Sequence, residues 1–207
     1  MTTPTATAVP TGSLFSLLFS FSGRGAIALL GVALVLLYTL KLFPDASESS
    51  GSAQNKVTQL QLSHTVSDFG NVLLTWSATK DDAVRIMKEA NILRLDSTFP
   101  AVYGVTFAFL YAWLTGRRVP TRVDRLMFAV PFLAAVFDYV ENTLELVALS
   151  GIDTRADVTR AIAQHTLNAG AIFWQSASAY AKYTLLAVWS VGAIAAIVQR
   201  AVRGARR

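Results

Sequence analysis

The sequence contains no cysteine. This absence excludes a disulfide framework, thiolate metal ligands and a cysteine nucleophile. Histidine is scarce as well: His64 and His165 lie in separate segments, so we expect no metal site, and nothing in the sequence indicates a cofactor. The common enzyme signatures are also missing, including H-E-x-x-H, G-x-S-x-G, the P-loop and the dinucleotide fingerprint. The sequence therefore names no reaction.

Charged residues are also scarce, at 15% of the chain, whereas a soluble domain has about 25%. Four long apolar runs account for the difference, and each approaches the roughly 20 residues that cross a membrane as a helix. They are residues 25–43, 99–115, 126–149 and 178–199. None shows the period-two alternation of a membrane β-barrel strand. We therefore predict an all-α integral membrane protein with four transmembrane helices.

The distribution of basic residues predicts how these helices are oriented. The net charge is +5; Arg24 stands just before the first run, and arginines gather between the second and third runs and after the fourth. By the positive-inside rule these parts face the cytoplasm, together with both termini. The cytoplasmic parts are then residues 1–24, 116–125 and 200–207, and the outer segments are residues 44–98 and 150–177. Orientation explains the basic excess, so we expect no nucleic-acid binding. A bacterial inner (plasma) membrane fits these features best.

The outer segments carry amphipathic patterns. Apolar residues recur at helical spacing from Leu62 to Trp76 and again over residues 81–95, with a weaker pattern over residues 157–168. We expect these helices to cap the membrane bundle; the alternative is a docking surface or a lid. Asp96 lies just before the second apolar run, where we expect it to cap that helix.

The N-terminal region admits a second interpretation. The first apolar run and the small residues up to Ala53 resemble a cleaved signal peptide. The apolar core of such a peptide usually has about 7–15 residues, fewer than this run, and its leading segment is short. An uncleaved transmembrane helix is therefore the favoured interpretation of residues 25–43.

The third apolar run contains four polar residues, Asp138, Glu141, Asn142 and Glu145, which we call the polar stripe. Their spacing of i, i+3, i+4 and i+7 places them on one face of a helix. Counted from Leu126 at about 1.5 Å per residue, Asp138 lies near the middle of the membrane and Glu145 near its outer surface. A bare charge at the middle is costly, so the polar stripe requires partners, a water-filled cavity or protons.

Candidate partners of the polar stripe lie on the other predicted helices or beside them. They are Lys182, Lys41, Arg94 and Tyr103. We expect Lys182 to pair with Glu141 or Glu145, because antiparallel neighbours joined by one loop place these residues at similar depth. Asp138 has no cation at its expected level. We therefore expect Asp138 to be protonated and to donate a hydrogen bond.

The polar stripe leaves three roles open. It could be a structural seam between helices, a site for an ion, a proton or a small ligand, or the acid and base of an enzyme. We expect a non-enzymatic protein without catalytic residues. It would be a component of a membrane assembly, with other subunits or with copies of itself, or a binder of a small or lipid-like ligand. The alternative is a membrane-embedded enzyme or a proton- or ion-coupled carrier.

The predicted outline is similar to that of claudin-like proteins, which also have four helices with a long first and a shorter second outer segment. That family's extracellular cysteine pair and its W-x-x-L-W element are missing here. The resemblance therefore implies nothing about function.

Overall fold

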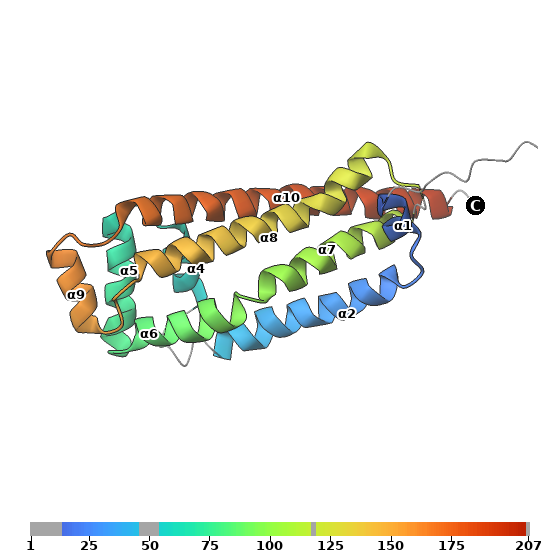
Figure 1. The fold of residues 1–207 in the computed structure, drawn as a ribbon. Helices are drawn as coiled ribbons and strands as arrows, with labels where there is room; N and C mark the ends of the chain where they lie inside the picture. The colour runs from blue at the N-terminus through green and yellow to red at the C-terminus, as the bar shows by residue number, and fades with distance from the viewer. Residues whose placement is uncertain (1–13, 46–53, 117–118, 206–207) are drawn as a thin grey trace, which may run out of the picture.

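The computed structural model describes residues 14–45, 54–116 and 119–205, and the regular structure in these residues is entirely helical. Long helices run side by side along the molecule; the short helices α4, α5, α6 and α9 gather at one end, and α1 lies at the other end (Figure 1). The long elements are α2 (Arg24–Leu37), its π-helical continuation η1 (Tyr38–Leu42), α7 (Phe99–Thr115), α8 (Arg122–Ala148) and α10 (Ala169–Ala205). The short elements are α1 (Leu14–Ser20), α4 (Gln54–Leu62), α5 (Val66–Thr79), α6 (Ala83–Met87), the π-helix η2 (Lys88–Leu95) and α9 (Arg155–Ala163).

Three helical segments of the described chain are long and apolar enough to cross a membrane. They are Arg24–Asp45, Ala83–Thr115 and Ala169–Val202. Their length and composition indicate a membrane location. The second segment is longer than predicted, because the helix expected over residues 81–95 runs on toward α7. Helix α8, which carries the polar stripe, is not among the three.

Helix α8 packs against both α7 and α10, whereas α2 packs chiefly against α7. Helix α7 ends at Gly116, whose φ of +62° lies in the left-handed region that favours glycine. Helix α8 then begins with a capping box, in which Thr121 and Asp124 bond to each other's backbone N–H groups. This short connection makes α7 and α8 antiparallel neighbours. The remainder of the basic link, Arg117 and Arg118, lies outside the described residues, as do Arg206 and Arg207 of the basic tail.

Glycines allow the long helices to approach closely. A Cβ atom placed on Gly31 of α2 would lie 2.2 Å from Thr106 Oγ1 of α7. On α10, a Cβ atom at Gly192 would lie 2.6 Å from Met127 Sδ of α8. Small residues at helix contacts are typical of packing in membranes, where van der Waals contact replaces the hydrophobic effect as the driving force.

Helices α4, α5, α6 and α9 share a hydrophobic core with the adjoining ends of α8 and α10. Its fully buried side chains include Phe69, Leu73 and Trp76 of α5, Met87 of α6 and Ile172 of α10. We call this end, formed by α4, α5, α6 and α9, the cap. The apolar faces of these amphipathic helices therefore pack against one another and against the ends of α8 and α10.

The boundaries of the cap helices differ from the sequence prediction. The single helix expected from Leu62 to Trp76 is interrupted, because Thr65 caps α5 by accepting a hydrogen bond from Asp68 N–H at 3.1 Å. The pattern over residues 157–168 corresponds to α9, which starts two residues earlier and ends at Ala163. Capping side chains set the first residue of α5 and of α9. The spacing of apolar residues alone does not predict where these helices begin.

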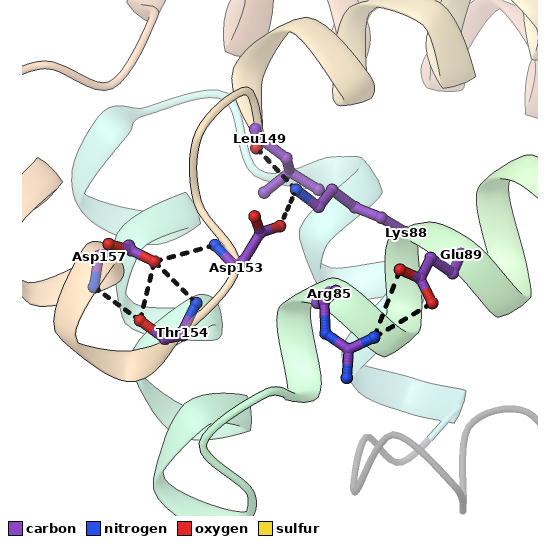
Figure 2. Close-up of polar contacts among 7 residues, drawn as sticks. All are labelled: Arg85, Lys88, Glu89, Leu149, Asp153, Thr154 and Asp157. Carbon is purple, nitrogen blue, oxygen red and sulfur yellow. Dashed lines mark hydrogen bonds and ion pairs between the residues drawn. The ribbon is translucent and has the colours of Figure 1, made fainter.

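Polar contacts join the cap to the bundle (Figure 2). Lys88 of η2 donates to the carbonyl of Leu149 at 3.3 Å and pairs with Asp153. A cation at the last carbonyls of α8 is favourable because the C-terminal end of a helix carries partial negative charge. Thr154 and Asp157 form the capping box of α9 a few residues further on. The turn between α8 and α9 is thereby held against η2.

Candidate functional site

Lys182 of α10 is the centre of a buried ion-pair cluster. Its Nζ atom lies 2.9 Å from Asp138 Oδ1 and 2.6 Å from Glu141 Oε2. The exposed fractions of the three residues are 5%, 4% and 0%. The structure therefore contains the expected pair of Lys182 and Glu141. The expectation that Asp138 has no cation at its level is wrong, because α10 begins at Ala169 and Lys182 lies well inside the helix.

The outer half of the polar stripe is also buried. Glu145 is only 2% exposed, and its Oε1 atom has no hydrogen-bond partner among the described residues. The expectation that Glu145 lies close to water is wrong, because the cap covers this end of α8. Asn142 is buried too, and its Nδ2 atom donates to the backbone carbonyl of Asp96 at 3.2 Å.

Two candidate cations are not part of the cluster. Lys41 lies 3.9 Å from Asp45, and both side chains are more than half exposed. Arg94 is exposed and forms no ion pair with the polar stripe in the described structure. Both predictions were wrong for the same reason: depth along a helix does not say which way a side chain faces. Tyr103, by contrast, lies beside Asp138 as expected, and both residues line the cavity described below.

A break between η2 and α7 lies next to the polar stripe. The π-helix ends at Leu95, and α7 begins at Phe99 with Thr98 as its N-cap, which makes no side-chain capping bond. The prediction that Asp96 caps this helix is therefore wrong. Backbone groups that leave the regular helical pattern need hydrogen-bond partners elsewhere in the protein.

Neighbouring helices supply those partners. Besides the bond from Asn142 to Asp96, Tyr139 of α8 donates its hydroxyl to the carbonyl of Ser97 at 3.2 Å. The hydroxyls of Tyr38 in η1 and Thr98 are 2.6 Å apart. The break is therefore held from α8 on one side and from η1 on the other.

A cavity of about 320 Å³ lies between the break and the ion-pair cluster. Side chains from α2, η1, α4, α7, α8 and α10 line it. The charged lining residues are Asp96, Asp138 and Lys182, and the apolar wall includes Val35, Phe43, Val57, Phe99, Phe107 and Leu186. Tyr183 also lines the cavity and donates to Gln61 Oε1 of α4 at 3.0 Å. Thr39 of the π-helix η1 lines this cavity, and the π-helix η2 ends one residue before Asp96. Turns of π-helix are rare in proteins overall, and those that occur are often found at functional sites.

The charges around the cavity do not balance. The carboxyl groups of Asp96, Asp138, Glu141 and Glu145 lie around the single ammonium of Lys182. The Asp96 carboxyl group forms no hydrogen bond or ion pair with any described residue. Unpaired negative charge in a low-dielectric site is costly, so it requires protons or a cation. In the part of the chain that the structure describes, no group of His, Cys, Asp and Glu side chains is arranged to hold a metal ion.

Sequence reasoning missed Asp96 as a site residue and treated it only as a helix cap. The available signal was the turn-prone run from Asp96 to Pro100, which separates an amphipathic pattern from an apolar run. It also did not predict which groups the hydroxyls of Tyr38, Tyr139 and Tyr183 bond, because these bonds join segments far apart in the sequence.

Comparison with known protein families, with curated proteins and with solved structures found no match to this chain. Its class therefore follows from its own features. It is an all-helical protein with segments suited to a membrane, a buried ion-pair cluster and an adjoining cavity.

Proposed function

We propose that the chain is an integral membrane protein with four spanning helices, which binds a small apolar or lipid-like ligand in the cavity beside Lys182. Helix α8 would be the fourth span. Its 27 residues are enough to cross the hydrocarbon core, and two of its intramembrane carboxyl groups are paired with Lys182. Both ends of the chain and the α7–α8 link would face the cytoplasm, and the cap would lie outside.

The observation that carries the ligand proposal is the composition of the cavity. Most of its wall is apolar or aromatic, and its charged groups are gathered at Asp96, Asp138 and Lys182. Ligand sites in proteins typically combine an apolar wall with a few placed polar groups, in volumes of about 300–1,000 Å³. The cavity of about 320 Å³ falls at the small end of this range. A purely structural seam would need the ion pairs but no adjoining space.

The arrangement of the helices supports entry from the lipid phase. Val35 and Thr39 line the cavity on the side of α2, and Leu186 lines it on the side of α10. Helix α2 packs chiefly against α7. Several leucines of α2, including Leu30 at 65% exposure, are not covered by any other part of the described structure. An apolar molecule dissolved in the bilayer would reach the cavity between α2 and α10 without crossing water.

A cavity-filling variant tests the ligand proposal. Leu186→Trp should occupy the apolar part of the cavity, whereas Val191→Trp introduces the same side chain on the same helix at a position that is 68% exposed. Each protein is purified in mild detergent, and its co-purified small molecules are identified by mass spectrometry. We expect the wild type and Val191→Trp to retain a molecule that Leu186→Trp loses. Equal retention by all three, or none in the wild type, would contradict the proposal.

The lack of cysteine makes the four-span topology simple to test. Single cysteines at Val119, Ser150 and Gly204 can be labelled with a membrane-impermeant maleimide in intact cells, since no native thiol competes. We expect Ser150→Cys to react from outside, and the other two to react only after permeabilisation. Reaction of Val119→Cys and Ser150→Cys from the same side would show that α8 does not span.

A proton-coupled carrier is the second candidate, favoured by the buried Glu145 Oε1 atom without a partner. Such a protein in liposomes should take up protons when a gradient is applied together with its ligand. Glu145→Gln should abolish that uptake and leave ligand binding in place. Unchanged uptake in this variant would exclude a coupling role for Glu145.

A further inference from the structure

We propose that the ligand of this cavity is an organic ammonium ion with an apolar body, bound by Asp96 and by the aromatic wall beside it. This inference rests on the proposed function, because it names the ligand class of the same cavity.

The first argument concerns which charge the cavity leaves unpaired. Lys182 already contacts both Asp138 and Glu141 within 3 Å, so its positive charge is not available to an anionic ligand. The carboxylate of Asp96 has no such partner in the described structure, and it lines the same cavity. The charge that a ligand can satisfy is therefore negative, and attraction between opposite charges is strong at low dielectric.

The second argument is the aromatic wall that follows Asp96. Phe99 lies 5.2 Å from Phe43 and 5.3 Å from Tyr103, and Tyr103 lies 5.9 Å from Phe107, measured between ring centroids. All four rings line the cavity. Aromatic faces attract organic cations, and the attraction grows when water is excluded. A hydrated metal ion gains little from such a wall, whereas an alkylated ammonium ion fits both its charge and its apolar surface.

The third argument is the hydroxyl of Tyr103. This residue is only 3% exposed and lines the cavity beside Asp138, and no hydrogen bond of regular geometry to its oxygen is found within the described part of the chain. A buried hydroxyl oxygen carries partial negative charge, which attracts a cation at low dielectric. A quaternary ammonium ion between Asp96 and Tyr103 would place its positive charge next to that oxygen.

The position of Asp96 in the break explains how its carboxylate can be offered to the cavity. Four residues after Asp96 stands Pro100, which has no N–H to donate, so the Asp96 carbonyl lacks a helical donor and Asn142 supplies one from α8. The residue is thereby fixed through its backbone while its side chain remains unpaired. We infer that this is why an acidic residue occupies an interruption in an apolar segment.

The test uses two probes of the same shape, phenyltrimethylammonium and its neutral counterpart tert-butylbenzene. Binding to the full chain is measured by ligand-observed NMR in a maltoside detergent, which contains no ammonium group, with empty micelles as the baseline. We expect the cation to bind about tenfold more tightly than the neutral probe, as one desolvated cation–aromatic contact plus an ion pair would give.

Variants separate the two contributions. Asp96→Asn should weaken binding of the cation about tenfold and leave binding of tert-butylbenzene unchanged. Phe99→Leu keeps the wall apolar but removes one ring, and it too should weaken the cation more than the neutral probe. Glu89→Gln makes the same change of charge at an exposed residue of η2 that does not line the cavity, and it should change neither affinity. If Asp96→Asn fails to fold, Phe99→Leu still carries the test.

The outcomes distinguish this inference from the proposed function. Equal binding of both probes, unchanged in Asp96→Asn, would overturn the ammonium proposal and leave a neutral-ligand cavity. Preferential binding of the anion 3-phenylpropionate would also overturn it and would make Lys182 the binding group. Failure of every probe to bind would count against the cavity as a binding site and thus against both proposals.

Discussion

The side-chain amide of Asn142 donates to the backbone carbonyl of Asp96 at 3.2 Å, and this bond ties α8 to the break that precedes α7. Asp96 lies between η2 and α7, where the regular ladder of helical hydrogen bonds is interrupted. A carbonyl left without a partner there would be costly. The bond therefore links the polar stripe to the irregular backbone, and it fixes the acidic side chain that we assign to ligand binding.

Loss of this bond should destabilise the protein. In Asn142→Leu the Asp96 carbonyl loses its donor, and we expect a loss of about 1–3 kcal/mol in the free energy of unfolding. The neighbouring Thr143→Val is the matched control, because Thr143 is exposed and bonds only to its own helix; its effect should stay within about 0.5 kcal/mol. Thermal unfolding in detergent measures both. Equal effects in the two variants would show that the bond contributes nothing specific.

Removal of the buried cation should cost more. Lys182→Met leaves Asp138 and Glu141 buried without their partner, and we expect a destabilisation of about 3–5 kcal/mol. The triple variant Asp138→Asn, Glu141→Gln, Lys182→Met should be more stable than Lys182→Met alone, since no uncompensated charge remains. Chemical unfolding of the variants measures the difference. Additive losses would mean that the three groups do not interact.

A larger residue at Gly31 should separate α2 from α7. Gly31→Ala places a Cβ atom 2.2 Å from Thr106 Oγ1, so we expect a loss of about 1–3 kcal/mol from overpacking. Adding Thr106→Ala should restore part of the loss. Gly204→Ala is the control, since its added Cβ would meet nothing within 4 Å. If thermal unfolding shows the same small effect for Gly31→Ala as for Gly204→Ala, then α2 and α7 do not approach closely at Gly31.

The capping box of α9 should make the cap sensitive to acid. Hydrogen bonds from the side chain and backbone of Thr154 lower the pKa of Asp157. A carboxyl group with a lowered folded-state pKa stabilises the fold fully above its unfolded value of about 3.9, and the contribution is lost as pH falls through the folded value. The stability difference between wild type and Asp157→Asn should therefore be constant near neutral pH and shrink below about pH 4. Hydrogen exchange of α9 amides measures it, and a difference that persists into stronger acid would contradict the assignment.

Much of the polar stripe could be predicted from the sequence, because helical periodicity is local. The spacing of Asp138, Glu141, Asn142 and Glu145 places them on one face of α8, and the structure buries that face. Lys182 could be named as a partner because helices joined by one loop are antiparallel. The partner of Asp138 could not be named correctly, because the start of α10 was placed too late and Lys182 was therefore assigned to the wrong depth.

The break at Asp96 could not be derived from local pattern. Asp-Ser-Thr before Phe-Pro is a normal helix start. The spacing of apolar residues does not reveal that Tyr139 and Asn142 of another helix donate to the carbonyls of Ser97 and Asp96. The same limit applies to Lys41 and Arg94, which have suitable charge and depth but face away from the polar stripe.

By itself, the amino-acid sequence determined the helical class, the apolar segments that indicate a membrane, and the shared face of the polar stripe. These properties follow from composition and from a repeat of 3.6 residues per turn, which neighbouring residues specify. Only the tertiary structure decided that Lys182 pairs with Asp138 and Glu141, that Glu145 is buried under the cap, and that Asp96 opens onto a cavity. Those relationships depend on how far each helix extends and on which of its faces meets a neighbour, and contacts between distant segments set both.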